Sequence, residues 1–97
     1  GCQPKDGARI PGIRKWQEAY LPKIYDKKRI DSIIEMDESD ARMMAKRLAK
    51  EEAIFSGMSS GGAVHAALEL SKTLSSGVIV CIICDRGDRY LSSNLFE

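Results

Sequence analysis

The chain has 97 residues, 43% of them hydrophobic and 30% charged, and its formal net charge is +1. This length allows at most one domain, and the near-neutral charge gives no electrostatic reason to expect a nucleic-acid or membrane partner. No apolar run approaches the roughly 18 residues of a membrane-spanning helix, so we expect a soluble protein.

The chain opens on residues 1–4, which are typical of the end of a β-strand whose beginning lies upstream. There is no initiator methionine and no targeting pattern, so the sequence is expected to be part of a longer protein. Residues 5–28 lack a sustained hydrophobic period, which predicts a long loop with a turn of helix around residues 13–19. Long loops in α/β proteins are often functional.

Residues 10–16 contain the candidate binding residues of this loop. Gly12 permits close backbone approach, and Arg14 can hold an anion through its bidentate guanidinium fork. From the residues alone, the alternative is a surface arginine beside Trp16, with the tryptophan packed on the domain.

A strand and a helix follow the loop. Residues 30–36 are predicted to be a β-strand, and either Asp37 or Ser39 is expected to cap a helix that runs to about Glu52. Met43 and Met44 are interpreted as core packing. The apolar stripe of this helix is expected at Ala41, Met44, Ala45, Leu48 and Ala49.

Residues 63–74 are predicted to form a second helix, with the Ser-Ser-Gly-Gly segment at its N-terminus and a serine as its cap. His65 is expected on its surface. The apolar run at residues 78–84 predicts a buried parallel strand. Ligands bind outside the carboxyl ends of such strands, so Cys84, Asp85 and Arg86 are expected to face the same ligand as the glycine-rich turn. Taken alone, that turn suggests a phosphate cradle or an ordinary tight turn.

The three cysteines, at positions 2, 81 and 84, are odd in number, and a disulfide scaffold is not expected. On an extended strand Cys81 and Cys84 would point to opposite faces about 10 Å apart. We therefore expect neither a redox pair nor a metal site from them. A reducing, cytoplasmic location fits this usage of cysteine.

Four separated motifs together carry a family resemblance. They are Gly-x-Gln-Pro at 1–4, Ile-Pro-Gly-Ile-Arg at 10–14, Gly-Met-Ser-Ser-Gly-Gly-Ala at 57–63 and Cys-Asp-Arg-Gly-Asp-Arg-Tyr-Leu-Ser at 84–92. The chain resembles the C-terminal third of the cysteine synthase B family, also called O-acetylserine sulfhydrylase B. The resemblance implies an α/β fold, in which residues 1–97 form the C-terminal part of the large domain of a fold type II pyridoxal-phosphate enzyme, with a mostly parallel, helix-flanked sheet.

The same resemblance implies an activity for the parent protein. The expected reaction replaces the acetoxy group of O-acetylserine by sulfide or thiosulfate, giving cysteine or S-sulfocysteine and acetate. Pyridoxal 5'-phosphate serves as the electron sink while the protein supplies orientation and electrostatics. The implied partners are these small molecules, the N-terminal part of the same enzyme and a second copy in a homodimer.

The resemblance also assigns roles to residues of the two glycine-containing motifs. Ser59 matches the serine that hydrogen-bonds the pyridine nitrogen, and Cys84 matches a position that lines the pocket beside the ring. The glycines of the turn then allow approach of the ring instead of cradling a phosphate. A neutral hydroxyl beside the positive end of a helix disfavours a protonated ring. Asp85, Arg86 and Asp88 are expected to brace the turn.

The loop residues match a substrate-facing segment of the family. Gly12 and Ile13 are expected to present their backbone to the substrate, and Arg14 is expected to accept larger, anionic sulfur donors. Lys15 is the less favoured alternative, because an ammonium group makes point contacts rather than a fork.

Two departures from the family pattern qualify the activity. No lysine of this chain lies in the Ser-x-Lys-Asp context of the lysine that binds the cofactor covalently, so the fragment alone is expected to be inactive. Ala53 stands where the family has glycine, and a left-handed conformation there would cost about 1 kcal/mol. Two alternatives remain open, namely another fold type II enzyme such as a cystathionine β-synthase, and a non-catalytic remnant or interaction module.

Overall fold

A short parallel sheet and two helices make up the regular structure of the computed structural model, which describes residues 1–97. Strand β1 (Cys2–Pro4) pairs in parallel with β2 (Ile34–Met36), with Cys2 opposite Ile34. This confirms the predicted strand end at residues 1–4. The second strand is shorter than the predicted 30–36, because β1 offers only three residues to pair with.

Helix α1 (Glu38–Glu52) begins and ends where the sequence predicts. Asp37 is its N-cap, and the Asp37 backbone N–H donates to Asp40 Oδ2 at 3.4 Å in a capping-box arrangement. At the other end Ala53 takes the left-handed conformation with φ 56°, so the helix ends as the family's glycine would end it. The Ile54 N–H then donates to Leu48 O at 3.0 Å, which satisfies a carbonyl of the last turn.

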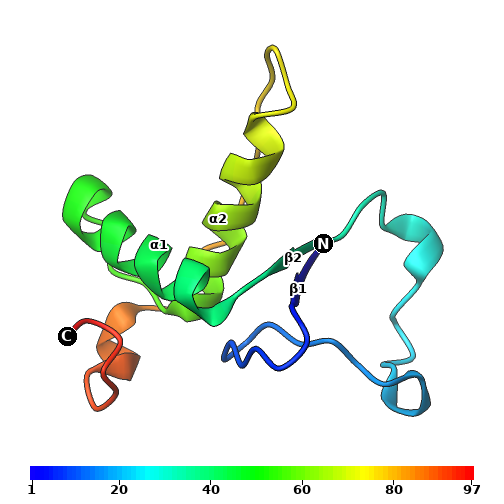
Figure 1. The fold of residues 1–97 in the computed structure, drawn as a ribbon, viewed down its shortest axis with the longest axis horizontal. Helices are drawn as coiled ribbons and strands as arrows, with labels where there is room; N and C mark the ends of the chain where they lie inside the picture. The colour runs from blue at the N-terminus through cyan, green and yellow to red at the C-terminus, as the bar shows by residue number, and fades with distance from the viewer.

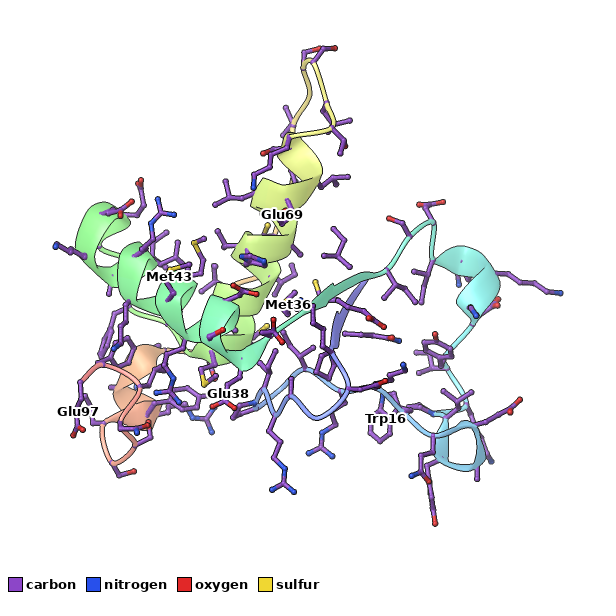
Figure 2. The ribbon with its side chains drawn as sticks, in the orientation of Figure 1. Trp16, Met36, Glu38, Met43, Glu69 and Glu97 are labelled. Carbon is purple, nitrogen blue, oxygen red and sulfur yellow. The ribbon has the colours of Figure 1, made fainter.

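Four of the five predicted stripe residues of α1 are fully buried, and Ala49 is half-buried. Met44 is part of that core, but the expectation for Met43 is wrong because its side chain is 51% exposed. Met43 lies one position off the apolar stripe, on the face of α1 that points to solvent (Figure 2). The buried stripe residues are Ala41, Met44, Ala45 and Leu48.

Helix α2 (Met58–Ser71) starts five residues before the predicted position and contains the Ser-Ser-Gly-Gly segment within its first turns. Its N-cap is Gly57 and not the predicted serine. Glycine has no side chain, so the first turn of α2 has no side-chain cap. Helix packing explains the early start: a Cβ on Gly61 would lie 2.3 Å from the Ala41 carbonyl oxygen, so this glycine lets α2 touch the backbone of α1. Tertiary contact thus outweighs the low helix propensity of glycine.

The core lies where α1, α2 and the end of β2 meet (Figure 1). His65, expected on the surface, is largely covered: its side chain is 17% exposed, and Nε2 lies 3.9 Å from Asp40 Oδ2 on α1. The buried apolar residues of this core are Ile10, Met36, Ala41, Ala45, Met58, Ala66 and Leu95.

Residues 78–84, predicted to be a buried parallel strand, run extended beside α2 but form no sheet. Val78 and Val80 are 92% and 84% exposed, whereas Cys81 is partly covered and lies 3.8 Å from the Ala63 carbonyl oxygen. The prediction fails because a strand needs a neighbouring strand for its backbone hydrogen bonds, and β1 and β2 pair only with each other. We refer to residues 78–84 as the 78–84 segment.

The loop between β1 and β2 extends away from the helices (Figure 1). The helical turn predicted around residues 13–19 is confined to a 3₁₀ turn at Glu18–Tyr20, and a second 3₁₀ turn covers Lys27–Arg29. An isolated bridge between Ile10 and Ile13 folds the start of the loop back toward the core. No helix in the structure combines the length and apolarity needed to cross a membrane.

Candidate functional site

A cleft of about 710 Å³ is lined by all five residues that the sequence singled out for binding, together with mainly apolar side chains of α2 and the 78–84 segment. The fold brings them from three separate parts of the chain: the loop after β1, the first turn of α2 and the end of the 78–84 segment. A second cleft, of about 1110 Å³, is lined by residues 5–17 of the same loop together with residues of α1 and the C-terminal turn. The five residues are Gly12, Ile13, Arg14, Ser59 and Cys84.

Two adjacent serines at the start of α2 have different tasks. The Ser60 hydroxyl is fully buried and accepts a hydrogen bond from the Cys84 backbone N–H at 3.0 Å, which ties α2 to the end of the 78–84 segment. Ser59 is 7% exposed, and its hydroxyl makes no hydrogen bond with the protein while it borders the cleft. Ser59, and not the fully buried Ser60, is therefore the serine whose hydroxyl lies at the cleft without a protein partner and can donate to a bound molecule.

Gly12 lies directly against Ser59. Its φ is +90°, in the region that favours glycine, and a Cβ at this position would be 2.9 Å from Ser59 Cβ and 3.1 Å from Ser59 Oγ. Any larger residue would crowd the Ser59 hydroxyl. The loop glycine and the helix serine thus form one rim of the cleft.

Asp85 holds the start of α2, as the sequence predicted when it assigned Asp85 to bracing this turn. Asp85 Oδ1 accepts the Gly57 backbone N–H at 3.1 Å, and Asp85 Oδ2 accepts the Tyr90 hydroxyl. The hydrogen bond to Asp85 raises the pKa of Tyr90, so its hydroxyl remains a donor. Sequence reasoning missed Tyr90, and the only available signal was an aromatic residue shortly after the acidic one in the same motif.

Arg86 and Asp88 have a smaller part in this turn than expected. They form an exposed ion pair with each other, with Arg86 Nη2 3.2 Å from Asp88 Oδ2. This pair lies within the turn at residues 85–90 and touches neither the start of α2 nor the cleft.

The two neighbouring cations of the loop differ in what they contact. The Arg14 guanidinium lies 5.7 Å from the centre of the Trp16 ring and forms no ion pair. The Lys15 ammonium lies 3.7 Å from Asp6 Oδ1 and 3.8 Å from Glu35 Oε1. Arg14 is thus the cation with uncommitted hydrogen-bond donors at the cleft, held in place by stacking.

The thiols of the chain are all free. Burial raises the pKa of the Cys2 thiol, and Cys2 also lines the cleft. Cys84 is exposed, and its sulfur lies at the cleft. The structure contains no group of three or more histidine, cysteine or carboxylate side chains arranged to hold a metal ion.

Comparison with known proteins gives consistent matches. The chain is 56% identical over 97 residues to cysteine synthase B of Pseudomonas aeruginosa and 48% identical over 96 residues to that of Escherichia coli. It spans about a third of these relatives, 32% of each. The crystal structure of a cysteine synthase from Entamoeba histolytica superposes with a TM-score of 0.84 at 33% identity, over 98% of this chain and 31% of that one.

A structural neighbour of lower sequence identity also matches the whole chain. An O-acetylserine dependent cystathionine beta-synthase from Helicobacter pylori matches with a TM-score of 0.79 at 27% identity, over the whole chain and 34% of the neighbour. The family model described as "pyridoxal-phosphate dependent enzyme" matches residues 3–85. The chain therefore belongs to the family of pyridoxal-phosphate dependent enzymes.

Proposed function

We propose that the chain is the C-terminal part of a cysteine synthase B, which makes cysteine or S-sulfocysteine from O-acetylserine and sulfide or thiosulfate. The observation that carries the proposal is the meeting of the free Ser59 hydroxyl, Gly12 and Arg14 at one cleft. The 45% to 56% identity with three cysteine synthase B enzymes supports this assignment. A cystathionine-forming activity is less supported, since the Helicobacter pylori neighbour is 27% identical.

The donor set at the rim of the cleft fits pyridoxal 5'-phosphate. Ser59 offers a neutral hydroxyl donor, which suits the uncharged nitrogen of a pyridine ring, and the missing side chain of Gly12 leaves that donor accessible. The positive end of the α2 dipole acts in the same direction, because it disfavours a protonated ring nitrogen. When bound, the cofactor supplies an electron sink for β-replacement. Cys84 would line the pocket beside it.

The loop would hold the substrates at this rim. The backbone of Gly12 and Ile13 is proposed to face the amino-acid substrate, and Arg14 to bind the anionic sulfur donor. Trp16 keeps the guanidinium at the cleft without neutralising it, so its planar fork is available for two hydrogen bonds to an oxyanion. Thiosulfate, which carries such oxygens, would gain more from Arg14 than sulfide does.

The remainder of the longer protein is proposed to complete the sheet. Strand β1 is paired on one edge only, the 78–84 segment has no strand partner, and residues of both line the same cleft. A strand from the N-terminal part would occupy the deep end of the cleft near Cys2 and Ile79, while the rim at Ser59 takes the cofactor. That part would also supply the lysine that binds the cofactor covalently. The parent enzyme is proposed to be a cytoplasmic homodimer.

The experiment is a comparison of sulfur donors with the full-length protein. Steady-state kinetics with O-acetylserine would be measured with sulfide and with thiosulfate, for the wild type, Arg14→Ala and the control Lys15→Ala. Loss of a charged hydrogen bond predicts that Arg14→Ala raises the KM for thiosulfate about tenfold and leaves sulfide kinetics nearly unchanged. Lys15→Ala should change the kinetics with thiosulfate and with sulfide only slightly, because Lys15 forms ion pairs with Asp6 and Glu35.

Absence of both cysteine formation from sulfide and S-sulfocysteine formation from thiosulfate would refute the proposed function. Equal thiosulfate kinetics for Arg14→Ala and the wild type would refute only the assignment of Arg14.

A further inference from the structure

The start of α2 has no capping side chain of its own, and a side chain from another part of the chain instead binds the backbone N–H of its N-cap residue. The capping residue Gly57 has no side chain to bond the free N–H groups of the first turn. Asp85, 28 residues later, accepts the Gly57 N–H with one carboxylate oxygen at 3.1 Å. Its other oxygen accepts the Tyr90 hydroxyl, so both oxygens of this carboxylate are committed.

The contact between this pair and Gly57 is direct. A Cβ on Gly57 would lie 2.3 Å from Tyr90 Cε2 and 2.7 Å from Asp85 Oδ1, so the ring and the carboxylate rest against its Cα. A further contact holds the neighbouring chain, because the Gly87 N–H donates to Phe55 O at 2.8 Å. The turn at residues 85–90 therefore fixes the chain just before α2 at two points.

The start of α2 borders both clefts of the molecule, and Tyr90 lines the larger one. Tyr90 and Met58 line the larger cleft, while Ser59, the next residue of α2, lines the smaller one. Ser59 is two residues from Gly57 in the first turn of the helix. A displacement of Gly57 would move the Ser59 hydroxyl with it, since the backbone of a helical turn is stiff.

We propose that Asp85 and Tyr90 are positioning residues for the cofactor, which set the place of Ser59 by holding the Gly57 N–H. The inference rests on the proposed function. The negative charge of Asp85 has a second effect, because a carboxylate at a helix N-terminus offsets part of the positive potential there. The raised pKa of Tyr90 is consistent with this arrangement, since it keeps the hydroxyl protonated as the donor to Asp85.

The test uses the full-length protein, freed of cofactor and titrated with pyridoxal 5'-phosphate. Asp85→Ala removes both hydrogen bonds, and Asp85→Asn keeps an acceptor for Gly57. Tyr90→Phe keeps the ring against Gly57 and removes only the hydroxyl. Asp88→Ala is the matched control, because Asp88 is in the same turn but pairs with the exposed Arg86.

The expected result is graded. Asp85→Ala should weaken cofactor affinity about tenfold, because loss of both hydrogen bonds lets Gly57 shift and misplaces the Ser59 hydroxyl, at a cost comparable to losing one hydrogen bond to the cofactor. Asp85→Asn should restore affinity to within about threefold, and Tyr90→Phe should fall between them. The visible absorption band of the bound cofactor should shift in Asp85→Ala, and Asp88→Ala should match the wild type in both measurements. Urea unfolding of each variant separates this effect from a general loss of stability.

Wild-type affinity and spectrum in Asp85→Ala would overturn the inference, as would an equal loss in Asp88→Ala. If Asp85→Ala does not fold, Tyr90→Phe decides, and an unchanged affinity and spectrum in that variant would overturn it. Failure of the wild type to bind the cofactor at all would instead overturn the proposed function.

Discussion

The α1–α2 pair and the 78–84 segment are both rich in apolar side chains, but only the helix pair buries them. Ala41, Met44 and Ala45 of α1 are at most 5% exposed, whereas Val78 and Val80 are more than 80% exposed. A helix makes its backbone hydrogen bonds internally and needs only one surface to pack against. A strand needs a hydrogen-bonding neighbour as well, and the 78–84 segment has none.

The difference shows which part of the molecule satisfies its backbone hydrogen bonds and buries its apolar side chains without the rest of a longer protein. The helix pair contains the capping box of α1, its buried stripe and its close contact at Gly61. The 78–84 segment is tied to α2 by the Cys84 N–H to Ser60 hydrogen bond, but its outer side is open.

The largest effect is expected at Met36, which is fully buried under α2. Met36→Ala should lower the free energy of unfolding by about 3 kcal/mol, because it leaves a cavity between the sheet and the helix pair. Met43→Ala is the control, since Met43 is 51% exposed, and it should change stability by less than about 0.5 kcal/mol. Urea unfolding measures both, and similar losses would contradict the assignment of the core.

The close contact of the helices predicts the next effect. Gly61→Ala should destabilise by about 2 kcal/mol, because the added methyl group would press on the Ala41 carbonyl and on the backbone of Ala45. At Gly1 a Cβ has only ordinary contacts, the nearest at 3.5 Å, so Gly1→Ala serves as the control. Chemical denaturation of both variants is the measurement, and an unchanged or higher stability of Gly61→Ala would break the proposed packing.

At the end of α1 a substitution should stabilise the protein. Ala53 has φ 56°, and Ala53→Gly should raise the free energy of unfolding by about 1 kcal/mol by relieving the left-handed strain. Ala49→Gly, inside the same helix, should lower it by about 1 kcal/mol. Thermal unfolding distinguishes the two, and a loss in both would mean that the helix end is not strained.

The connection between the two regions predicts a dependence on pH. The pKa of Tyr90 is raised in the folded protein by its hydrogen bond to Asp85. Its contribution to stability is therefore complete below the ordinary tyrosine pKa of about 10, and is lost as pH rises through the folded value. Urea midpoints of the wild type should fall more steeply than those of Tyr90→Phe between about pH 9 and pH 11.

The raised pKa of the Cys2 thiol acts in the same direction, but Cys2 is present in both proteins and cancels in the difference. Parallel pH profiles for the wild type and Tyr90→Phe would show that the Tyr90 hydroxyl is not held by Asp85.

The smallest effect on stability is expected in the exposed 78–84 segment. Val80 is 84% exposed, and Val80→Thr should change the stability of this chain by less than about 0.5 kcal/mol. In the full-length protein the same change should cost more than about 1 kcal/mol, because the proposed neighbouring strand would bury the hydroxyl. Equal small effects in both proteins would contradict that pairing.

The sequence predicted local structure well where neighbouring residues decide it. The start of α1 follows from Asp37 and Asp40, and its buried face follows from the spacing of alanine, methionine and leucine. The start of α2 was misplaced because its glycines look unfavourable to a helix until the contact with α1 is seen. The same limit applies to His65, which faces Asp40 on the neighbouring helix.

By itself the sequence determined the α/β class, the extent of α1, the family resemblance and the short list of candidate binding residues, because these depend on spacing and on motifs. Only the tertiary structure decided that Gly12 lies on Ser59, that Ser59 and not Ser60 borders the cleft, and that Asp85 and Tyr90 hold Gly57. It also decided that the 78–84 segment is exposed. These features depend on contacts between residues far apart in the chain, and no local pattern encodes such contacts.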